Sequence, residues 1–158
     1  MINQKLRFIE AWDGDQSWTI AKWTKSSIAK LSAEETLINR AIFNFGSPLN
    51  GAEEIVNKGI VFLDHAPHYW IIEDQGDLLI EYFISTETFL LVKTFFTKII
   101  GEPLYVTREV VKYENFQGFS FPTHIKFKTE TMVAEYVFNK IILGDSVKEK
   151  RFSRPEKR

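Results

Sequence analysis

The sequence predicts a mainly β fold with a helical insertion (α+β), built as an antiparallel, curved half-barrel of about eight or nine strands with one or two short helices. Short alternating apolar runs separated by turn residues predict the strands, and a change to helical spacing predicts the insertion at about residues 32–57. No long helical segment follows Gly59. The length of 158 residues fits a single domain over 1–158 that buries its own core.

The first predicted element is a hairpin in the stretch "AWDGDQSWTI". Asp13-Gly14 is a strong turn signal between extended segments, because glycine adopts the positive φ that tight hairpin turns require. Residues 3–13 and 17–23 are therefore expected to pair as strands. Trp12 and Trp18 then flank the turn.

The helical insertion follows the hairpin. Ser32 and Glu35 have the spacing of a capping box, in which each residue satisfies a backbone N–H of the other. The apolar residues that recur at helical spacing after it are Leu37, Ile38, Ala41, Ile42 and Phe45. A second short helix is expected at about 52–57, ending at Gly59.

Strand signals follow one another from Gly59 onward. The apolar runs are "GIVFLDH", "HYWIIED", "LLIEYFIS", "TETFLLVKTFF", "PLYVTREVVKYE", "FSFPTHIKFKTE" and "TMVAEYVFNKIIL". Gln75-Gly76-Asp77 and "NFQG" are turns between them, so the strands form a meander. Pro122 lacks an N–H and is expected at a bulge or a sheet edge.

The segment "DLLIEYFIS" carries apolar side chains on both faces. Its alternation puts Leu78, Ile80, Tyr82 and Ile84 on one face, while Leu79 and Phe83 share the other with Glu81. A turn centred on Thr86-Glu87 would place Phe89 opposite Ile84 and Leu91 opposite Tyr82, with Lys93 on the same apolar face. Two interpretations follow: a closed core covered by the 32–45 helix, or a hollow that holds an apolar ligand.

Composition and charge exclude several function classes. Twenty Lys and Arg against 21 Asp and Glu give a net charge of -1, so binding to nucleic acid is not expected. The chain has no cysteine, and no apolar stretch is long enough to span a membrane. The start lacks the features of a secretion signal. The tail at about 145–158 is basic, as solvated termini often are.

Chemical motifs are few. Asp64, His65 and His68 are the nearest approach to a metal site, but Pro67 keeps their segment extended and no second cluster supplies further ligands. Nucleophile-elbow, P-loop, dinucleotide-binding and zinc-protease motifs are absent from the sequence. We therefore predict no enzyme activity, no cofactor and no metal; a cavity site that uses His65 or His124 is the weaker enzymatic alternative.

Several motifs, taken in order, resemble the outer-membrane lipoprotein-sorting family with the LolA-like fold. They are "DGDQSWTI", the helix ending "AIFNFGSPL", "LLIEYFISTETFLLVK", "YENFQGFSFPTHIKF" and the closing "VFNKIILGDSVKEKRFSRP". The resemblance implies a non-enzymatic periplasmic carrier whose incomplete barrel shields the acyl chains of a lipoprotein or related lipid. Compared with the family, this chain is short at its N-terminus, so a more open barrel is expected.

The residues expected to line the lipid-binding hollow are Trp18, Ile20, Leu78, Ile80, Tyr82, Ile84, Phe89 and Leu91. An apolar interior of this kind accepts acyl chains without directional bonds. The second hypothesis is a β-sheet interaction module without a lipid ligand, which forms a homodimer or recruits a partner through an exposed sheet edge.

Overall fold

A computed structural model of the protein describes most of residues 54–141 and parts of the chain before them. The described residues are 8–12, 17–21, 29–32, 35, 36, 39, 41, 44, 49, 52, 54–99 and 103–141, with only the backbone described for 8–12 and 21. The chain forms two compact units, residues 1–43 with 141–158, and residues 44–140. The single domain over 1–158 stays a prediction.

The first unit contains a small antiparallel sheet in the order β1-β2-β3. Its strands are β1 (Phe8–Trp12), β2 (Ser17–Ala21) and the two-residue β3 (Ala29–Lys30). Trp12 pairs with Ser17 across β1 and β2, which confirms the N-terminal hairpin. The Asp13-Gly14 turn lies outside the described residues.

The start of the predicted insertion has the expected cap. The Ser32 N–H donates to Glu35 Oε2 at 2.8 Å, and the Glu35 N–H donates to Ser32 Oγ at 3.1 Å. The Ser32 backbone N–H and the Ser32 hydroxyl both donate to the Glu35 carboxylate, and these two hydrogen bonds lower the pKa of Glu35. Much of 32–45 lies outside the described residues, so the helix itself stays a prediction.

The prediction of a helix at the end of the insertion is wrong. The sequence predicts a second short helix at about 52–57, but strand β4 (Ile55–Leu63) already begins within this range. A helix of one turn is costly to nucleate, whereas the branched side chains of Ile55 and Val56 favour an extended backbone. Pairing with the next strand, at Ile55 with Glu73, then decides the conformation.

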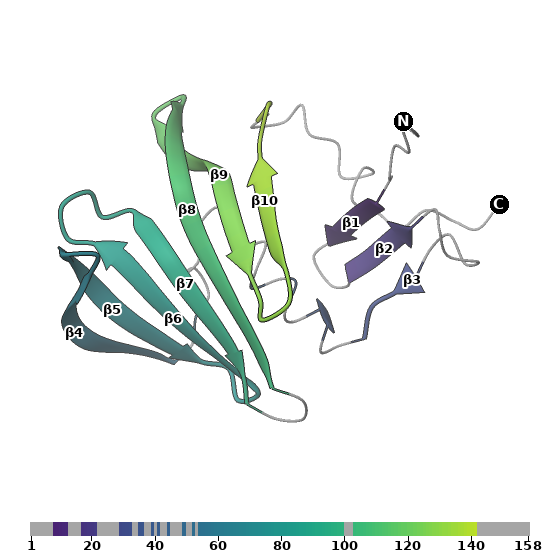
Figure 1. The fold of residues 1–158 in the computed structure, drawn as a ribbon, viewed down its shortest axis with the longest axis horizontal. Helices are drawn as coiled ribbons and strands as arrows, with labels where there is room; N and C mark the ends of the chain where they lie inside the picture. Colours follow the sequence, from purple (N-terminus) through teal and green to yellow (C-terminus); the bar gives the residue numbers. More distant parts are fainter. Residues whose placement is uncertain are drawn as a thin grey trace. The chain divides into compact units, whose positions relative to one another are not determined.

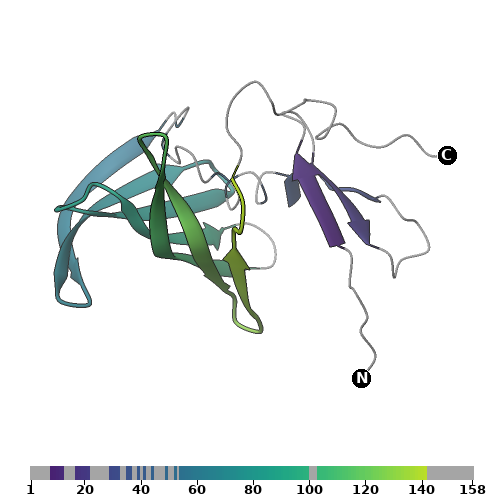
Figure 2. The same cartoon turned by 90° about the horizontal axis from the view of Figure 1, so that it is seen from above.

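The second unit is a seven-stranded sheet in the order β10-β9-β8-β7-β6-β5-β4, and every neighbouring pair is antiparallel. After β4, its strands are β5 (Ala66–Asp74), β6 (Leu78–Ser85), β7 (Leu91–Lys98), β8 (Leu104–Phe116), β9 (Phe119–Lys128) and β10 (Val133–Val137). Figures 1 and 2 show this sheet strongly twisted and open, with β4 and β10 at its two edges. The mainly antiparallel β prediction is confirmed, although the described residues form ten strands rather than eight or nine.

Register shifts interrupt three of the strand pairings, including β6 with β7 between Phe83 and Ile84. The β4–β5 register shifts between Asn57 and Gly59, where Gly59 has a φ of 98° that other residues rarely adopt. The β8–β9 register shifts around Lys112 and Tyr113, and Tyr113 is the residue paired with Pro122. The expected position of Pro122 at a bulge is therefore confirmed.

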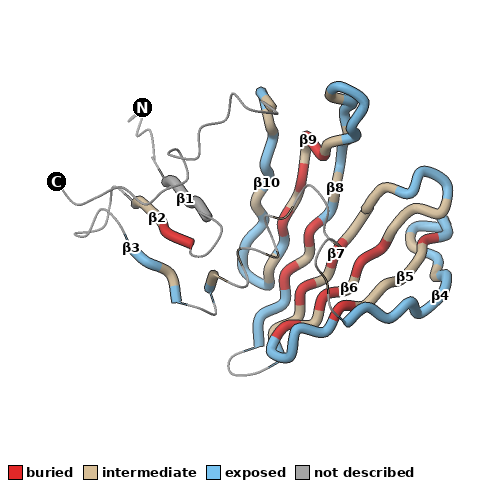
Figure 3. The backbone as a smooth tube through the Cα atoms, turned by 180° about the vertical axis from the view of Figure 1, so that it is seen from behind, coloured by how far each residue is buried: buried red, intermediate tan, exposed pale blue. Residues whose placement is uncertain are grey.

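The core of this unit lies along the central strands. Figure 3 shows buried positions on β6, β7, β8 and β9, whereas the edge strands β4 and β10 are largely exposed. The largest burial thus occurs where strands have neighbours on both sides.

Candidate functional site

One face of the seven-stranded sheet, which we call the buried face, is the candidate binding surface. Residues paired across strands share a face, so Tyr82, Thr94, Arg108 and Phe127 form one row across β6 to β9. Ile80, Phe96 and Val106 form the next row. All seven residues are buried. The buried face is thus largely apolar, with a few polar groups at defined points.

Arg108 is a fully buried cation on this face. Its Nη2 donates to Thr94 Oγ1 at 3.1 Å, and its Nη1 donates to the backbone carbonyl of Asn44 at 3.2 Å. The guanidinium carbon lies 5.4 Å from the centre of the Phe96 ring, which is within cation–π range. Burial lowers the pKa of Arg108 to about 10, so the side chain remains a cation at neutral pH.

Tyr82 and Glu73 form a second polar group on the same face. The Tyr82 hydroxyl donates to Glu73 Oε2 at 2.5 Å, and the Gln75 side-chain amide donates to Glu73 Oε1 at 2.6 Å. Burial, followed by the hydrogen bond to Glu73, raises the pKa of Tyr82 far above its usual range. Tyr82 therefore acts as a neutral hydrogen-bond donor at physiological pH.

The other face of the same strands, which we call the aromatic face, carries a row of rings. Trp70 stacks on Phe83 with ring centres 6.4 Å apart, and Phe83 meets Phe95 edge to face at 5.4 Å. The Trp70 indole N–H donates to Glu81 Oε2 at 2.9 Å. Lys93 pairs with Phe83, so the expectation that Lys93 shares the face of Tyr82 is wrong.

That error has one source, the register of β6 and β7. Leu91 lies opposite Ile84, not opposite Tyr82, and Tyr82 lies opposite Thr94. The connection spans residues 86–90, and a register shift between Phe83 and Ile84 displaces the pairing again. The predicted two-residue turn at Thr86-Glu87 is shorter than this connection. Within the longer loop, Phe89 takes a left-handed φ of 57°.

The structure brings together part of the predicted binding set. Leu78, Ile80 and Tyr82 are buried on one face of β6, and Ile84 pairs with Leu91 further along the strand. Phe89 is exposed in the β6–β7 loop. Trp18, which is buried, and the half-buried Ile20 lie on β2 in the other unit.

Sequence reasoning missed Arg108 and Glu73. Both are buried on the face of Ile80 and Tyr82, and Glu73 is the β5 partner of Ile80. A signal was present, because strict alternation in "YVTREVV" puts Arg108 on the same face as Val106. A charge within an apolar alternation indicates a buried polar group with a specific partner.

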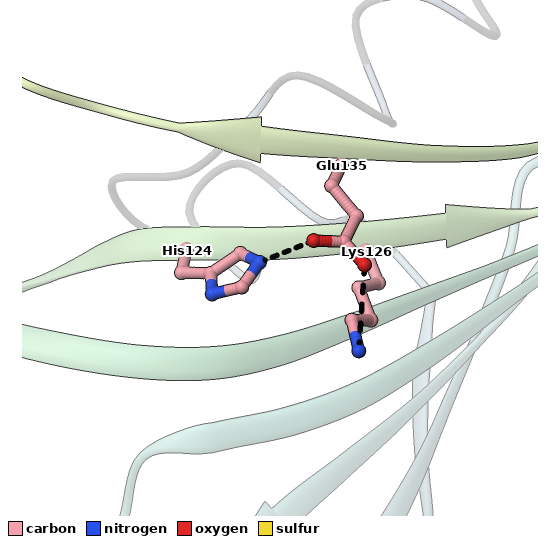
Figure 4. A network of polar contacts seen from close by, with 3 residues as sticks. All are labelled: His124, Lys126 and Glu135. Carbon is pink, nitrogen blue, oxygen red and sulfur yellow. Dashed lines mark hydrogen bonds and ion pairs between the residues drawn. The ribbon is translucent and has the colours of Figure 1, made fainter.

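The histidines form no metal site in the part of the chain that the structure describes. His68 is buried and its Nδ1 lies 2.9 Å from the Ala66 carbonyl. His124 Nε2 instead contacts Glu135 Oε2 at 3.0 Å, and Lys126 Nζ lies 3.5 Å from Glu135 Oε1 (Figure 4). Among the described residues, no three His, Asp or Glu side chains are grouped to hold a metal ion.

Comparisons with known proteins agree with the architecture. No protein-family model and no curated protein matches the chain. The structure is similar to the crystal structure of a LolA superfamily protein from Nitrosomonas europaea, with a TM-score of 0.59, 16% identity, and coverage of 89% of this chain and 67% of that chain. The predicted LolA-like fold is therefore confirmed. Among the described residues, no helix has the length and apolarity needed to cross a membrane.

Proposed function

We propose that the protein is a non-enzymatic periplasmic carrier that holds the acyl chains of a lipoprotein, or a related lipid, against the buried face of its open sheet. The observation that carries the proposal is the set of buried apolar side chains Ile80, Phe96, Val106 and Phe127 on one face across four strands of a LolA-like fold. Leu78, Tyr82, Ile84 and Leu91 extend the proposed contacts along β6 and β7. Phe89, in the β6–β7 loop, and Trp18 and Ile20, on β2 of the other sheet, are left out of these proposed contacts.

The physical basis is the transfer of methylene groups out of water. Each buried methylene contributes roughly 0.8 kcal/mol, and branched and aromatic side chains accept a hydrocarbon without directional bonds. Carrying a lipid in this way needs no covalent step. Several polar groups on this face already bond to one another, since Tyr82 donates to Glu73 and Arg108 donates to Thr94.

Access to the buried face requires a change in what covers it. The side chains of Ile80 and Phe96 are almost fully buried, and Asn44 lies against this face through its hydrogen bond from Arg108. An acyl chain can contact those side chains only in a form where the covering residues have moved. Cargo that binds only this form shifts the population toward it.

The proposal is tested by titrating a fluorescent fatty acid into the purified protein, with mass spectrometry of an organic extract as a second readout. We expect saturable binding near one probe per protein. Phe96→Ala, on the buried face, should weaken binding about tenfold, because a ring that contacts the chain is lost. Phe83→Ala is the matched control, a buried phenylalanine of the aromatic face, and should leave probe affinity unchanged. Absence of both co-purified lipid and probe binding would overturn the proposal.

A β-sheet interaction module is the second candidate, and the edge strand β4 favours it. Ile55, Val56 and Ile60 are exposed on this strand, whose outer backbone groups have no neighbouring strand in the described sheet. Such an edge pairs readily with another chain or a second copy. Light scattering would show a stable dimer that Val56→Lys weakens, with no fatty-acid binding by either protein.

A further inference from the structure

Three hairpin turns leave the seven-stranded sheet at the same end. Consecutive strands are antiparallel, so the β4–β5, β6–β7 and β8–β9 connections share one end of the sheet (Figure 1). One largely exposed phenylalanine lies within or next to each connection: Phe62 near the end of β4 at 72%, Phe89 in the β6–β7 loop at 69%, and Phe119 at the start of β9 at 70%. No other large hydrophobic side chain among the described residues is as exposed. We call these three residues the phenylalanine tips.

The tip at Phe62 stands beside a tight turn. Leu63 pairs with Ala66, and the two residues between them, Asp64 and His65, have φ values of 49° and 67°. Two successive left-handed residues are the backbone of a narrow hairpin turn. Phe62 therefore projects from a short, defined tip on an edge strand.

The tip at Phe89 is held in a costly conformation. A left-handed φ of 57° is rare for a bulky residue, and strain of this kind persists where the surrounding structure imposes it. The Phe89 N–H donates to the Ser85 carbonyl at 3.0 Å, and the Ser85 N–H donates to the Leu90 carbonyl at 2.9 Å. Tyr69 stacks on one side of the ring with centres 6.2 Å apart. The loop thus fixes an exposed ring in place.

The tip at Phe119 follows the same plan. Gln117 and Gly118 both have positive φ, and the Gly118 N–H donates to Asn115 Oδ1 at 3.0 Å. Phe119 pairs with Phe116 across this turn. Three separate turns at the same end of the sheet, with three different sets of hydrogen bonds, therefore present the same type of exposed side chain.

We propose that the phenylalanine tips insert into the interfacial region of a phospholipid bilayer and dock the protein on it. A rigid protein partner would need a contiguous complementary surface, whereas a fluid interface accepts separate rings on convex tips. The charges near the turns favour a zwitterionic over an anionic phospholipid surface. Asp64 and Glu87 carry carboxylates at the turns, and the positive charge of Lys112 is paired with Glu114. This inference rests on the proposed function, since a lipid carrier has to meet a lipid surface to load or release its cargo.

Three exposed rings are suited to reversible docking. Each contributes by burial of apolar area, so removal of one ring should lower the vesicle partition coefficient roughly tenfold. Contacts of this kind are insensitive to salt, unlike attraction between charges. The protein can then leave the surface once cargo has been exchanged.

The test is flotation of the protein with phosphatidylcholine vesicles. We expect the wild type to float with the vesicles at both low and high salt. Phe62→Thr and Phe119→Thr replace the ring with a residue that favours strands. Phe89→Asn replaces it with a residue that tolerates a left-handed backbone. Each single variant should partition roughly tenfold less, and the triple variant should remain in the soluble fraction.

Two controls make the result decisive. Ile99→Thr with Met132→Gln removes exposed apolar side chains at the opposite end of the sheet and should leave flotation unchanged. Fatty-acid binding without vesicles should survive in the triple variant.

Fatty-acid binding by a wild type that does not float overturns this inference alone, as does a triple variant that floats normally. Flotation without fatty-acid binding overturns the carrier function instead. Docking on a membrane protein is indicated if only protein-containing vesicles bind, and that result also overturns the inference.

Discussion

The two faces of the central strands differ in how they accommodate polar groups, although both are rich in large apolar side chains. On the buried face, Arg108, Tyr82 and Glu73 are almost fully buried and hydrogen-bonded. On the aromatic face, Glu81 and Lys93 are half-buried beside the Trp70, Phe83 and Phe95 rings.

The contrast shows that apolar content alone does not distinguish a core from a surface. A buried polar group costs free energy unless it is paired, so the buried face carries few of them, and Arg108, Tyr82 and Glu73 each form side-chain hydrogen bonds. The aromatic face keeps its charged groups within reach of water, where their exact pairing matters less. Substitutions matched between the two faces measure this difference.

The largest expected difference is in packing. Ile80→Ala on the buried face should lower the free energy of unfolding by about 3–4 kcal/mol, because the site is closed and leaves a cavity. Ile72→Ala on the half-buried aromatic face should cost roughly 1 kcal/mol, since water can fill the space. Urea denaturation of both variants measures the gap. Equal losses would mean that the two faces are equally closed.

A smaller difference is expected from the hydrogen bonds. Tyr82→Phe removes the donor to a buried Glu73 oxygen and should destabilise the protein by about 1–3 kcal/mol. Trp70→Phe removes the indole donor to the half-buried Glu81, whose oxygen can bind water instead, so the cost should be about 1 kcal/mol or less. Thermal unfolding at neutral pH gives the comparison. A larger loss for Trp70→Phe would reverse the assignment of the faces.

The smallest effect is expected at the exposed cluster of His124, Lys126 and Glu135 in Figure 4. The hydrogen bond with His124, and then Lys126, lowers the pKa of Glu135. As the pH falls, the Glu135 carboxylate is therefore protonated at a higher pH in the unfolded chain than in the folded protein. The stabilisation from the Glu135 contacts is fully present above the ordinary carboxyl pKa. It is lost as the pH falls through the pKa of Glu135 in the folded protein.

Glu135→Gln consequently should lower the melting temperature slightly at neutral pH and have no effect in acid. The wild-type and variant melting curves, recorded across the acid range, should converge. A constant difference at every pH would show that the ion pairs do not contribute. Moderate salt should shrink the neutral-pH difference, because these charges are exposed.

The errors in the predicted pairing of β6 with β7 trace to one loop. Strand alternation correctly grouped Leu78, Ile80 and Tyr82, because side chains alternate regardless of what the strand pairs with. The positions of Leu91 and Lys93 depended on the pairing of β6 with β7. A longer loop and a register shift moved both, and neither feature has a strong sequence signal.

The sequence by itself determined the order of the antiparallel strands, the turns between most of them, the position of Pro122 at a bulge and the capping box at Ser32. These are local properties, set by turn residues, side-chain alternation and hydrogen bonds between near neighbours. Only the tertiary structure decided where β4 begins, which residues of β7 face Tyr82, and how Arg108 is accommodated. These depend on pairing between strands and on burial, which residues distant in the sequence impose together.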